Sequence, residues 1–540
     1  MVRARTNIMV CGGTGCLASD SEKIIKNLEI ILKARGYSDE VKVIKTGCFG
    51  FCEQGPIVKI EPDNVFYVRV SPKDAKDIVD EHIIKGRKVD RLLYREPEKN
   101  EKINRQSDMP FYKKQLRVAL RNCGLVNPED IYEYIALGGY EALGKAITNM
   151  SRDEVIEEIK NSGLRGRGGG GFPTGVKWEI TSKQKSDVKF IICNADEGDP
   201  GAFMDRSILE GDPHSILEAM AIGGYAIGAS KGIIYIRAEY PLAISRLTTA
   251  IKQARELGLL GKNIFGTDFS FDIDIKYGAG AFVCGEETAL INSCEGKRGE
   301  PNYKPPYPAQ EGYWGHPTCV NNVETFANIP PIITKGAKWF ASMGTEKSKG
   351  TKVFALAGKI NNVGLVEVPM GITLREIIYD IGGGIVGGRK FKAVQTGGPS
   401  GGVIPEKYLD IPIDYDSLIS IGSMMGSGGM IVMDETDNMV EIAKFYLEFT
   451  MDESCGRCTP CRIGTKRMYE LLDKITSGKG TMEDLENLKQ LAHMVKASSL
   501  CGLGQTAPNP VISTMKHFWN EYLAFIKEAD KSKSKKQEKM

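Results

Sequence analysis

Two groups of four cysteines, out of 13 in this 540-residue chain, have spacings that could bind metal. The first group is Cys11, Cys16, Cys48 and Cys52, in the glycine-containing turns CGGTGC and GCFGFC. Glycine lets the backbone approach inorganic sulfide closely and leaves amide N–H groups free to point at a cluster. Structural zinc also uses four cysteines, but its pairs usually sit on tight C-x2-4-C knuckles. The spacing therefore favours a [2Fe-2S] cluster over zinc or four unligated thiols.

The second group joins three cysteines in one loop to a distant fourth. Cys455, Cys458 and Cys461 form a C-x2-C-x2-C run in the segment ESCGRCTPCR, and Cys501 follows in LCGLGQ. Three thiolates from a tight loop with a fourth from elsewhere is a ligation pattern of [4Fe-4S] clusters. Zinc is less well supported, because none of the five histidines lies near this loop. We predict one [4Fe-4S] cluster here.

The remaining cysteines show no ligand spacing and are expected to be buried and structural: Cys123, Cys193, Cys284, Cys294 and Cys319. An odd cysteine total without an export signal argues against disulfides. The start of the chain lacks the apolar core of a signal peptide, and no apolar run reaches the roughly 20 residues of a membrane helix. A net charge of +2 gives no electrostatic reason to expect nucleic acid. We therefore predict a cytoplasmic protein without direct membrane insertion.

A glycine-rich loop, GRGGGG at residues 166–171, formally contains G-x-G-x-x-G. A Rossmann site would need a strand just before the loop and a helix opening within it. Here the preceding stretch, Arg152–Lys160, has a helical pattern, so we predict a non-Rossmann loop. Its successive glycines could still hold a phosphate or a ring system, with charge from Arg167 and Lys177 and a stacking face from Phe172. The alternative is a flexible surface loop.

The chain is too long for one core, and its pattern suggests a multidomain α/β protein. We expect a β/α unit at 1–95, a charged linker at 96–109, a glycine-rich α/β unit at 110–349, a β-rich unit at 350–435, a helical unit at 436–525 and a disordered charged tail at 526–540. In the first unit we expect strands at Asn7–Val10 and Val41–Ile44, a hairpin of Ile57–Ile60 with Val65–Val70, and helices at Asp20–Arg35 and Pro72–Lys85. In the helical unit we expect helices at Val440–Phe449, Arg462–Ser477, Met482–Val495 and Val511–Lys527.

Residues 7–95 resemble the thioredoxin-like [2Fe-2S] ferredoxins, which include the small subunit of the NADH-dehydrogenase module of respiratory complex I. The resemblance is carried by the cysteine spacing of the first group within alternating strands and helices. It implies that a ferredoxin domain is fused here to the rest of the chain.

Five further segments resemble the FMN- and NADH-binding flavoprotein subunit of complex I and its soluble relatives: Leu164–Trp178, Cys193–Arg206, Tyr277–Leu290, Glu295–Ala309 and Pro317–Thr325. The relatives serve NAD(P)-linked and electron-bifurcating hydrogenases and NAD-linked formate dehydrogenases. The resemblance covers about residues 110–525, including ESCGRCTPCR and LCGLGQTAPNP. It implies a ubiquitin-like (SLBB-type, β-grasp) domain at 350–435.

The resemblance also implies roles for individual residues. Those expected to hold FMN are Gly166, Arg167, Gly168, Lys177, Asn194, Asp196, Glu197, Gly285, Glu286, Glu287, Val320, Asn321 and Asn322. Gly169 and Phe172 are expected to meet NADH, with Phe172 stacking on adenine. Glu197 and Glu287 are assigned a catalytic role in orienting nicotinamide; the alternative is that they only accept backbone hydrogen bonds.

The sequence departs from the family at several cofactor positions. Ile180 stands where a second aromatic clamp is frequent, and Asp199 stands where Glu is common. Phe282 and Tyr307 exchange the usual Tyr and Phe, so stacking is kept at 307 while a polar contact at 282 is lost. These changes leave the preference between NADH and NADPH open.

NADH gives up two electrons together, whereas an iron–sulfur cluster accepts one, and a flavin converts between the two. We therefore expect a subunit that is an NAD(H)-dependent oxidoreductase of an anaerobe, with FMN, NAD(H), one [2Fe-2S] and one [4Fe-4S] cluster, in a hydrogenase complex that is NAD-linked or electron-bifurcating. Expected partners are a small [2Fe-2S] subunit, a catalytic hydrogenase or dehydrogenase subunit, and ferredoxin. The alternative is the NADH-dehydrogenase module of a respiratory or formate dehydrogenase complex. A third hypothesis is a zinc-binding scaffold, which metal analysis would distinguish.

Overall fold

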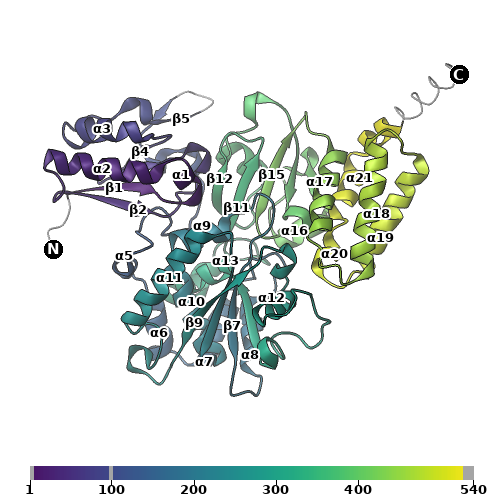
Figure 1. Cartoon of the computed structure of the whole chain (residues 1–540), viewed down its shortest axis with the longest axis horizontal. Helices are drawn as coiled ribbons and strands as arrows, with labels where there is room; N and C mark the ends of the chain where they lie inside the picture. The colour runs from purple at the N-terminus through teal and green to yellow at the C-terminus, as the bar shows by residue number, and fades with distance from the viewer. Residues whose placement is uncertain (1–4, 97–100, 527–540) are drawn as a thin grey trace.

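The N-terminal unit is a four-stranded sheet with a long amphipathic helix packed on it. In a computed structural model, which describes residues 5–96 and 101–526, the strand order is β2-β1-β3-β4. The strands are β1 (Thr6–Cys11), β2 (Val41–Thr46), β3 (Val58–Glu61) and β4 (Val65–Tyr67). Helix α2 (Ser21–Arg35) buries Ile24, Leu28 and Leu32 at helical spacing in the core of this unit. The structure confirms the predicted strands, the hairpin and the first helix (Figure 1).

The structure differs from the prediction between residues 72 and 109. The expected helix is present without a break from Pro72 to Ile83, but its hydrogen bonding changes along it: 3-10 at Pro72–Asp74, α3 at Ala75–Asp77 and π at Ile78–Ile83. The segment predicted as a linker contains β6 (Lys102–Ile103), which pairs with β5 (Tyr94–Arg95), and it ends at the fully buried Met109. Two paired residues and one buried side chain are too few to give the sequence a periodic apolar pattern. The charged composition of residues 96–109 was therefore the only signal, and it predicted a linker.

A sheet of four parallel strands organises the middle of the chain, in the order β10-β7-β8-β9. The strands are β7 (Phe190–Ala195), β8 (Lys231–Arg237), β9 (Asp272–Gly278) and β10 (Thr318–Asn322). The chain runs from β7 to β8 and β9 on one side and then returns to place β10 on the other side of β7. In parallel sheets such a reversal opens a crevice at the carboxyl ends of the strands.

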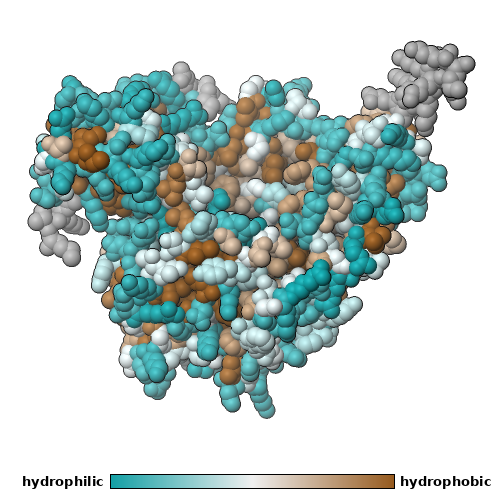
Figure 2. Space-filling view, in the orientation of Figure 1, coloured by the Kyte–Doolittle hydropathy of each residue, from teal (hydrophilic) through white to brown (hydrophobic). Residues whose placement is uncertain are grey.

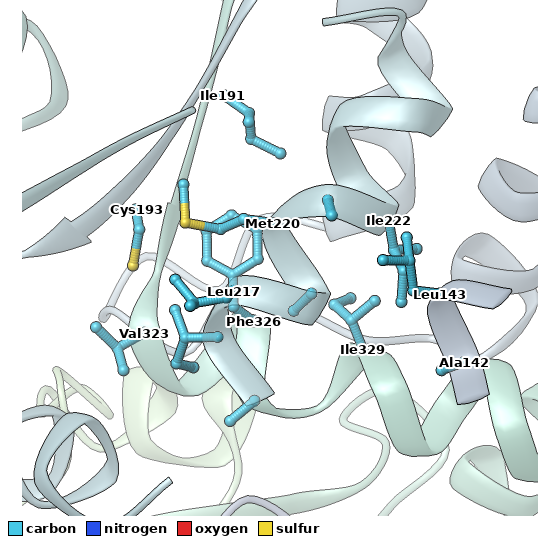
Figure 3. Packing of buried hydrophobic residues seen from close by; sticks show 14 of the residues in the cluster. Ala142, Leu143, Ile191, Cys193, Leu217, Met220, Ile222, Val323, Phe326 and Ile329 are labelled. Carbon is cyan, nitrogen blue, oxygen red and sulfur yellow. The ribbon is translucent and has the colours of Figure 1, made fainter. Parts of the chain in front are cut away.

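Helix α10 (Pro213–Ile227) fills the core on one face of the parallel sheet. It is apolar on nearly all sides, and all of its residues except Tyr225 are buried. Leu217 and Met220 pack with Phe326 in the same hydrophobic cluster (Figure 3). On the opposite face, α12 (Glu287–Cys294) packs through Leu290 and Ile291. The sheet is therefore covered on both sides, and its carboxyl end is where polar residues gather.

A mixed sheet and a group of helices complete the chain. The sheet has the order β12-β11-β15-β13-β14, with β11 (Thr351–Gly358), β12 (Gly364–Pro369), β13 (Phe391–Thr396), β14 (Val403–Pro405) and β15 (Gly429–Asp434). The helices are α17 (Met439–Asp452), α18 (Thr459–Thr476), α19 (Met482–Ser498), α20 (Gly502–Thr506) and α21 (Asn509–His517) (Figure 1). Strands β11 to β15 lie within the segment predicted to be β-rich, and the predicted helical C-terminal region is confirmed, although its predicted last helix is interrupted at Phe518. The predicted tail lies, from residue 527 on, outside the described residues.

The N-terminal unit is docked on the rest of the chain by a hydrogen bond and an aromatic stack. The backbone N–H of Thr14 donates to Glu210 Oε2 at 3.0 Å, and Glu210 lies near the end of α9 (Met204–Gly211). The Phe51 ring stacks on Phe111 at 4.2 Å between centroids. The hydrogen bond fixes the Cys11–Cys16 turn, and the stack fixes the Cys48–Cys52 turn, against later parts of the chain.

The surface is largely hydrophilic, with small apolar areas on the face drawn in Figure 2, as is usual for folded proteins. Among the described residues, no helix combines the length and the apolar character that crossing a membrane would require.

We predict that Gly47→Ala weakens docking of the N-terminal unit. An added Cβ at Gly47 would lie 2.3 Å from the Gly211 Cα, which is backbone and cannot rotate away. Overpacking of this kind costs about 1–3 kcal/mol, so the thermal unfolding midpoint should fall. Gly15→Ala is the matched control, because an added Cβ there meets no atom within 4 Å. Equal stability of the two variants would contradict the tight contact.

Candidate functional site

A cavity of about 490 Å³ opens at the carboxyl ends of β7 and β10, where the strand order reverses. Asn194 and Asp196 reach it from the end of β7, and Asn321 and Asn322 reach it from β10. Clefts at such reversals are the usual ligand sites of parallel sheets. The site is therefore assembled by topology from segments that are far apart in sequence.

The glycine loop forms one wall of this cavity. It follows α7 (Arg152–Asn161) and precedes α8 (Thr174–Ser182), with no strand before it. An added Cβ on Gly168 would lie 3.0 Å from the Asn322 Cβ, whereas Gly170 faces open space. The loop is held from outside, because Tyr415 Oη donates to Gly166 O at 2.7 Å and Arg165 Nε donates to Gly171 O at 2.7 Å. A side chain at Gly168 would thus strain the wall that a ligand must approach.

Asp196 is a buried carboxyl with one unpartnered oxygen in the cavity wall. Burial raises the pKa of Asp196 to about 7, against the opposing charge of Arg237, whose Nη1 lies 3.8 Å from Oδ1. Asp196 Oδ2 is buried and has no hydrogen-bond partner within the part of the chain that the structure describes. Asn194 is fixed beside it by donating to Gly285 O at 2.8 Å. An orphaned polar atom in a cavity indicates a missing ligand donor.

Glu197 also lines the cavity, but its side chain is committed to the backbone. Its two carboxylate oxygens accept N–H groups from Asp205 at 3.0 Å and Arg206 at 3.1 Å, at the N-terminus of α9. Burial raises the pKa of Glu197 against these hydrogen bonds. The geometry supports a structural role as a helix cap, and the catalytic role stays a prediction.

Glu286 and Glu287 are balanced by two lysines. Lys304 Nζ lies 2.8 Å from Glu286 Oε1 and 2.7 Å from Glu287 Oε1, and Lys177 Nζ lies 3.5 Å from Glu287 Oε2. Burial favours a raised pKa of Glu287, but Lys177 and Lys304 outweigh it and hold the pKa below its ordinary value. Glu287 is therefore ionised at neutral pH and fixed in place. Glu286 is fixed further by accepting from Thr288 N at 2.9 Å.

The mixed-sheet unit supplies the opposite wall, through loops around Gly397 and Gly426. Ser427 Oγ donates to Asp199 Oδ2, and burial raises the pKa of Asp199 to about 6. The wall is tied to the parallel sheet by a fully buried ion pair between Lys352 and Glu324. The cavity thus closes only when these two units are packed together.

Two predicted cofactor residues do not line the cavity. Arg167 is fully buried, and its guanidinium donates to carbonyl oxygens of Thr351 at 3.0 Å and Lys349 at 2.7 Å. It anchors the loop instead of adding charge to the cavity. Tyr307 is 54% exposed and lies outside the lining. All the other predicted cofactor residues line it, with Phe172, 49% exposed, as part of the lining.

The four C-terminal cysteines converge beside the cavity. Cys461 is buried, and burial raises its pKa to about 11, with further contributions from Cys458, Cys501 and Cys455. The Cys501 thiol accepts backbone N–H groups from Leu503 and Gly504 at the start of α20. Gly502, Leu503 and Thr506 of α20 also line the cavity. One short helix therefore joins the cavity to the four thiols.

The four N-terminal cysteines form a connected set. Cys11 lies within hydrogen-bonding reach of both Cys16 and Cys48, and the Cys48 and Cys52 sulfurs are 3.8 Å apart. An added Cβ on Gly55 would lie 2.7 Å from Cys16 Sγ, and one on Gly13 would lie 3.0 Å from Cys48 Cβ. Within the described residues, no three His, Cys, Asp or Glu side chains surround one metal-ion position. The thiols are linked pairwise, an arrangement that fits a multinuclear cluster.

The residues present fit the groups that the sequence predicted. The unpartnered Asp196 oxygen could accept a hydrogen bond from the polar chain of FMN, and the glycine wall leaves room for its phosphate. Both sets of four thiols fit iron–sulfur clusters. Sequence reasoning missed Lys304, Tyr415 and the loops around Gly397 and Gly426. Lys304 stood in a recognised segment without a role, and the glycine runs at 397–402 and 426–429 were the available signal for the second wall.

Comparisons with known proteins agree with this arrangement. Family models match as "Nuo51 FMN-binding domain" over residues 159–331, "NADH-ubiquinone oxidoreductase-F iron-sulfur binding region" over 441–525 and "Thioredoxin-like [2Fe-2S] ferredoxin" over 2–82. One NADH-quinone oxidoreductase subunit of Rhizobium meliloti is 46% identical over 76% of this chain and 98% of its own length. The chain belongs to the family of FMN-binding NADH-quinone oxidoreductase subunits. The resemblance predicted from the motifs is therefore confirmed.

Members and relatives of this family include hydrogenase subunits. NADP-reducing hydrogenase subunit HndC of Solidesulfovibrio fructosivorans is 68% identical over 77% of this chain and 84% of its own length. The crystal structure of an NAD+-reducing [NiFe]-hydrogenase in the H2-reduced state superposes with a TM-score of 0.68, at 31% identity, over 97% of this chain and 84% of that chain.

We predict that Asp196→Asn stabilises the FMN-free protein at pH 8.5 but hardly at pH 4. The carboxyl ordinarily titrates near 3.8 and titrates near 7 when folded. The folded state therefore binds the proton more tightly, so the stability from this group is fully present below pH 3.8, falls as pH rises from 3.8 to 7, and is gone above 7. Each pKa unit corresponds to about 1.4 kcal/mol, so the difference at pH 8.5 should reach a few kcal/mol. Chemical denaturation measures it, with the exposed Asp268→Asn as control. The same difference at both pH values would contradict the raised pKa.

Proposed function

We propose that the chain is the NAD(H)-oxidising or NAD-reducing flavoprotein subunit of a multi-subunit complex, passing electrons between NAD(H) and iron–sulfur clusters through FMN. One observation carries the proposal: a glycine-walled cavity shares α20 with a set of four thiols. A two-electron donor site next to a one-electron carrier is what such a reaction requires.

The chain's own residues bind and orient the reactants. Backbone N–H groups of the glycine loop and the polar groups of Asn194 and Asp196 would hold FMN, which when bound supplies the conversion between two-electron and one-electron transfer. Lys177 and Lys304 keep Glu287 ionised in the wall of the same cavity. The Glu287 carboxylate is therefore available to accept a hydrogen bond from the nicotinamide amide. Phe172 offers its exposed ring for stacking.

Two routes lead away from the cavity. The first is α20, whose N-terminal N–H groups meet Cys501. The second is α9, which begins at the Glu197 cap and reaches Glu210, the partner of Thr14 in the Cys11–Cys16 turn. Its 8 residues span about 12 Å at 1.5 Å per residue. This short separation supports the N-terminal cluster as an electron carrier near the flavin site, either as a store or as an exit.

The complex in which the subunit works is a finer proposal. The 68% identity to a hydrogenase subunit supports a soluble NAD(P)-linked hydrogenase over a respiratory or formate dehydrogenase complex. The same relative reduces NADP by its name, which keeps NADPH as a candidate. Partner subunits, ferredoxin, electron bifurcation, an anaerobic source and a cytoplasmic location stay predictions.

The finer fold assignments are also proposals. The helix before the glycine loop supports a non-Rossmann flavin site. The mixed five-stranded sheet supports a β-grasp domain at 350–435. The matched family ranges fall within the predicted units at 1–95, 110–349 and 436–525, whose boundaries stay predictions.

An anaerobic visible spectrum of the purified chain tests the proposed function. After reconstitution with FMN, addition of NADH should bleach both flavin and iron–sulfur absorbance, and NADPH serves as the comparison. Bleaching by either nucleotide shows the path from dinucleotide to cluster and identifies the preferred donor. Iron–sulfur absorbance that responds to neither nucleotide would rule out the dehydrogenase role.

We predict that Cys501→Ser removes the [4Fe-4S] cluster and spares the [2Fe-2S] cluster. The two thiol sets lie in separate units, so losing one ligand should affect only its own cluster. Iron and sulfide analysis with electron paramagnetic resonance measures the result. Cys294→Ser is the control, because Cys294 is a buried cysteine outside both sets. Loss of both clusters, or of neither, would contradict the assignment of Cys501.

A further inference from the structure

A second cavity, of about 280 Å³, lies where the N-terminal unit meets the segment that leads into the flavin-binding unit. We name it the seam cavity. Phe49, Lys59 and Asn64 line it from one side, and Tyr112, Arg117 and Arg121 line it from the other. Among the described residues, none of those lining it is Asp or Glu. The cavity is therefore walled by positive charge and polar groups.

Two of the three cations already have partners. Lys59 is 6% exposed, and its Nζ lies 2.6 Å from Glu61 Oε1. Arg121 Nη1 donates to Val118 O at 3.0 Å and Ala327 O at 2.8 Å, and its Nη2 lies 4.0 Å from Asp212 Oδ2. These contacts hold both side chains in place around the cavity.

Arg117 has no such partner. Its Nε is buried without a hydrogen bond, and no carboxylate forms an ion pair with it in the described ranges 5–96 and 101–526. Its charge is felt inside the protein, where it opposes the rise in the pKa of Tyr112 caused by burial. Asn64 Oδ1, also buried, has no partner in the same part of the chain. Arg117 as a whole is only half-buried, so the unmet groups are its buried Nε–H and the Asn64 oxygen, and buried polar atoms usually find a partner.

We propose that the seam cavity binds a small phosphate-bearing molecule, with Arg117 as the anchor and Lys59 and Arg121 beside it. The planar guanidinium presents parallel N–H donors that match an oxyanion. Lys59 and Arg121 keep their own partners, so Arg117 supplies the free charge; a phosphate suits it better than a carboxylate because phosphate carries up to two charges and accepts donors from several directions. The volume leaves room for a small organic group beside the anion but not for a large one.

The seam cavity is separate from the flavin cavity, since the two share no lining residue. It lies against the backbone next to Cys48, because Tyr112 Oη donates to Phe49 O at 3.0 Å. The inference does not depend on the proposed electron transfer.

Isothermal titration calorimetry on the full chain, loaded with FMN and both clusters, tests the proposal at constant ionic strength. Inorganic phosphate and glycerol 3-phosphate are the two probes, and acetate is the carboxylate comparison. Saturable binding of phosphate identifies the free ion as sufficient, and binding of glycerol 3-phosphate alone identifies a phosphate ester. Acetate binding as tightly as either probe would overturn the phosphate assignment.

Arg117→Gln should weaken phosphate binding by at least about tenfold, the effect of losing a charged hydrogen bond. Without phosphate this variant should unfold at a temperature no lower than the parent, because it removes an uncompensated charge. Arg117→Lys keeps the positive charge but loses the planar pair of N–H donors, so this variant should bind phosphate with intermediate affinity. Lys113→Gln is the matched control, since it removes one charge from an exposed neighbour outside the cavity.

Three results would overturn the proposal. The first is no saturable binding of either phosphate probe to the parent protein. The second is unchanged affinity in Arg117→Gln, or an equal loss in Lys113→Gln, which would indicate a general surface-charge effect. The third is release of flavin absorbance during the titration, which would place the phosphate in the flavin cavity.

Discussion

The reversal of strand order beside β7 is the constraint on which the functional site depends. Because β8 lies on one side of β7 and β10 on the other, the segments that follow β7 and β10 turn apart and leave a crevice between them. Asn194 and Asn322, at the ends of these strands, meet at that crevice. The glycine loop can line it only because Gly168 has no Cβ to meet Asn322. Topology makes the space, and missing side chains keep it open.

The site is shared between units, so its formation is coupled to their packing. Loops of the mixed-sheet unit close the cavity, and Tyr415 from that unit holds the glycine loop. The buried Lys352–Glu324 pair joins the two units where water is excluded. A buried pair of this kind adds little net stability, but leaving either charge alone is strongly unfavourable. It therefore favours one docking geometry, and that geometry is the one in which the cavity is complete.

Two helices extend the site toward the thiol sets. Helix α20 places its N-terminal N–H groups at Cys501 and its side chains in the cavity. Helix α9 begins at Glu197 and reaches Glu210, next to the Cys11–Cys16 turn. Glu197, assigned a catalytic role from sequence, thus caps the helix that leads to the N-terminal unit. A buried carboxylate near a flavin can therefore act by holding the backbone of a neighbouring helix in place, as well as by touching the cofactor directly.

The sequence by itself determined the local chemistry: the cysteine spacings, the glycine loop without a preceding strand, and the periodic helices such as α2 and α19. These signals are short-range, because ligand spacing and amphipathic period are properties of neighbouring residues. Only the tertiary structure decided which wall faces the glycine loop, that Lys304 balances Glu286 and Glu287, that Arg167 points away from the cavity, and that Arg117 is left unpaired. The physical reason is that burial and charge pairing depend on which distant segments meet, and no pattern along one segment records its partner across the fold.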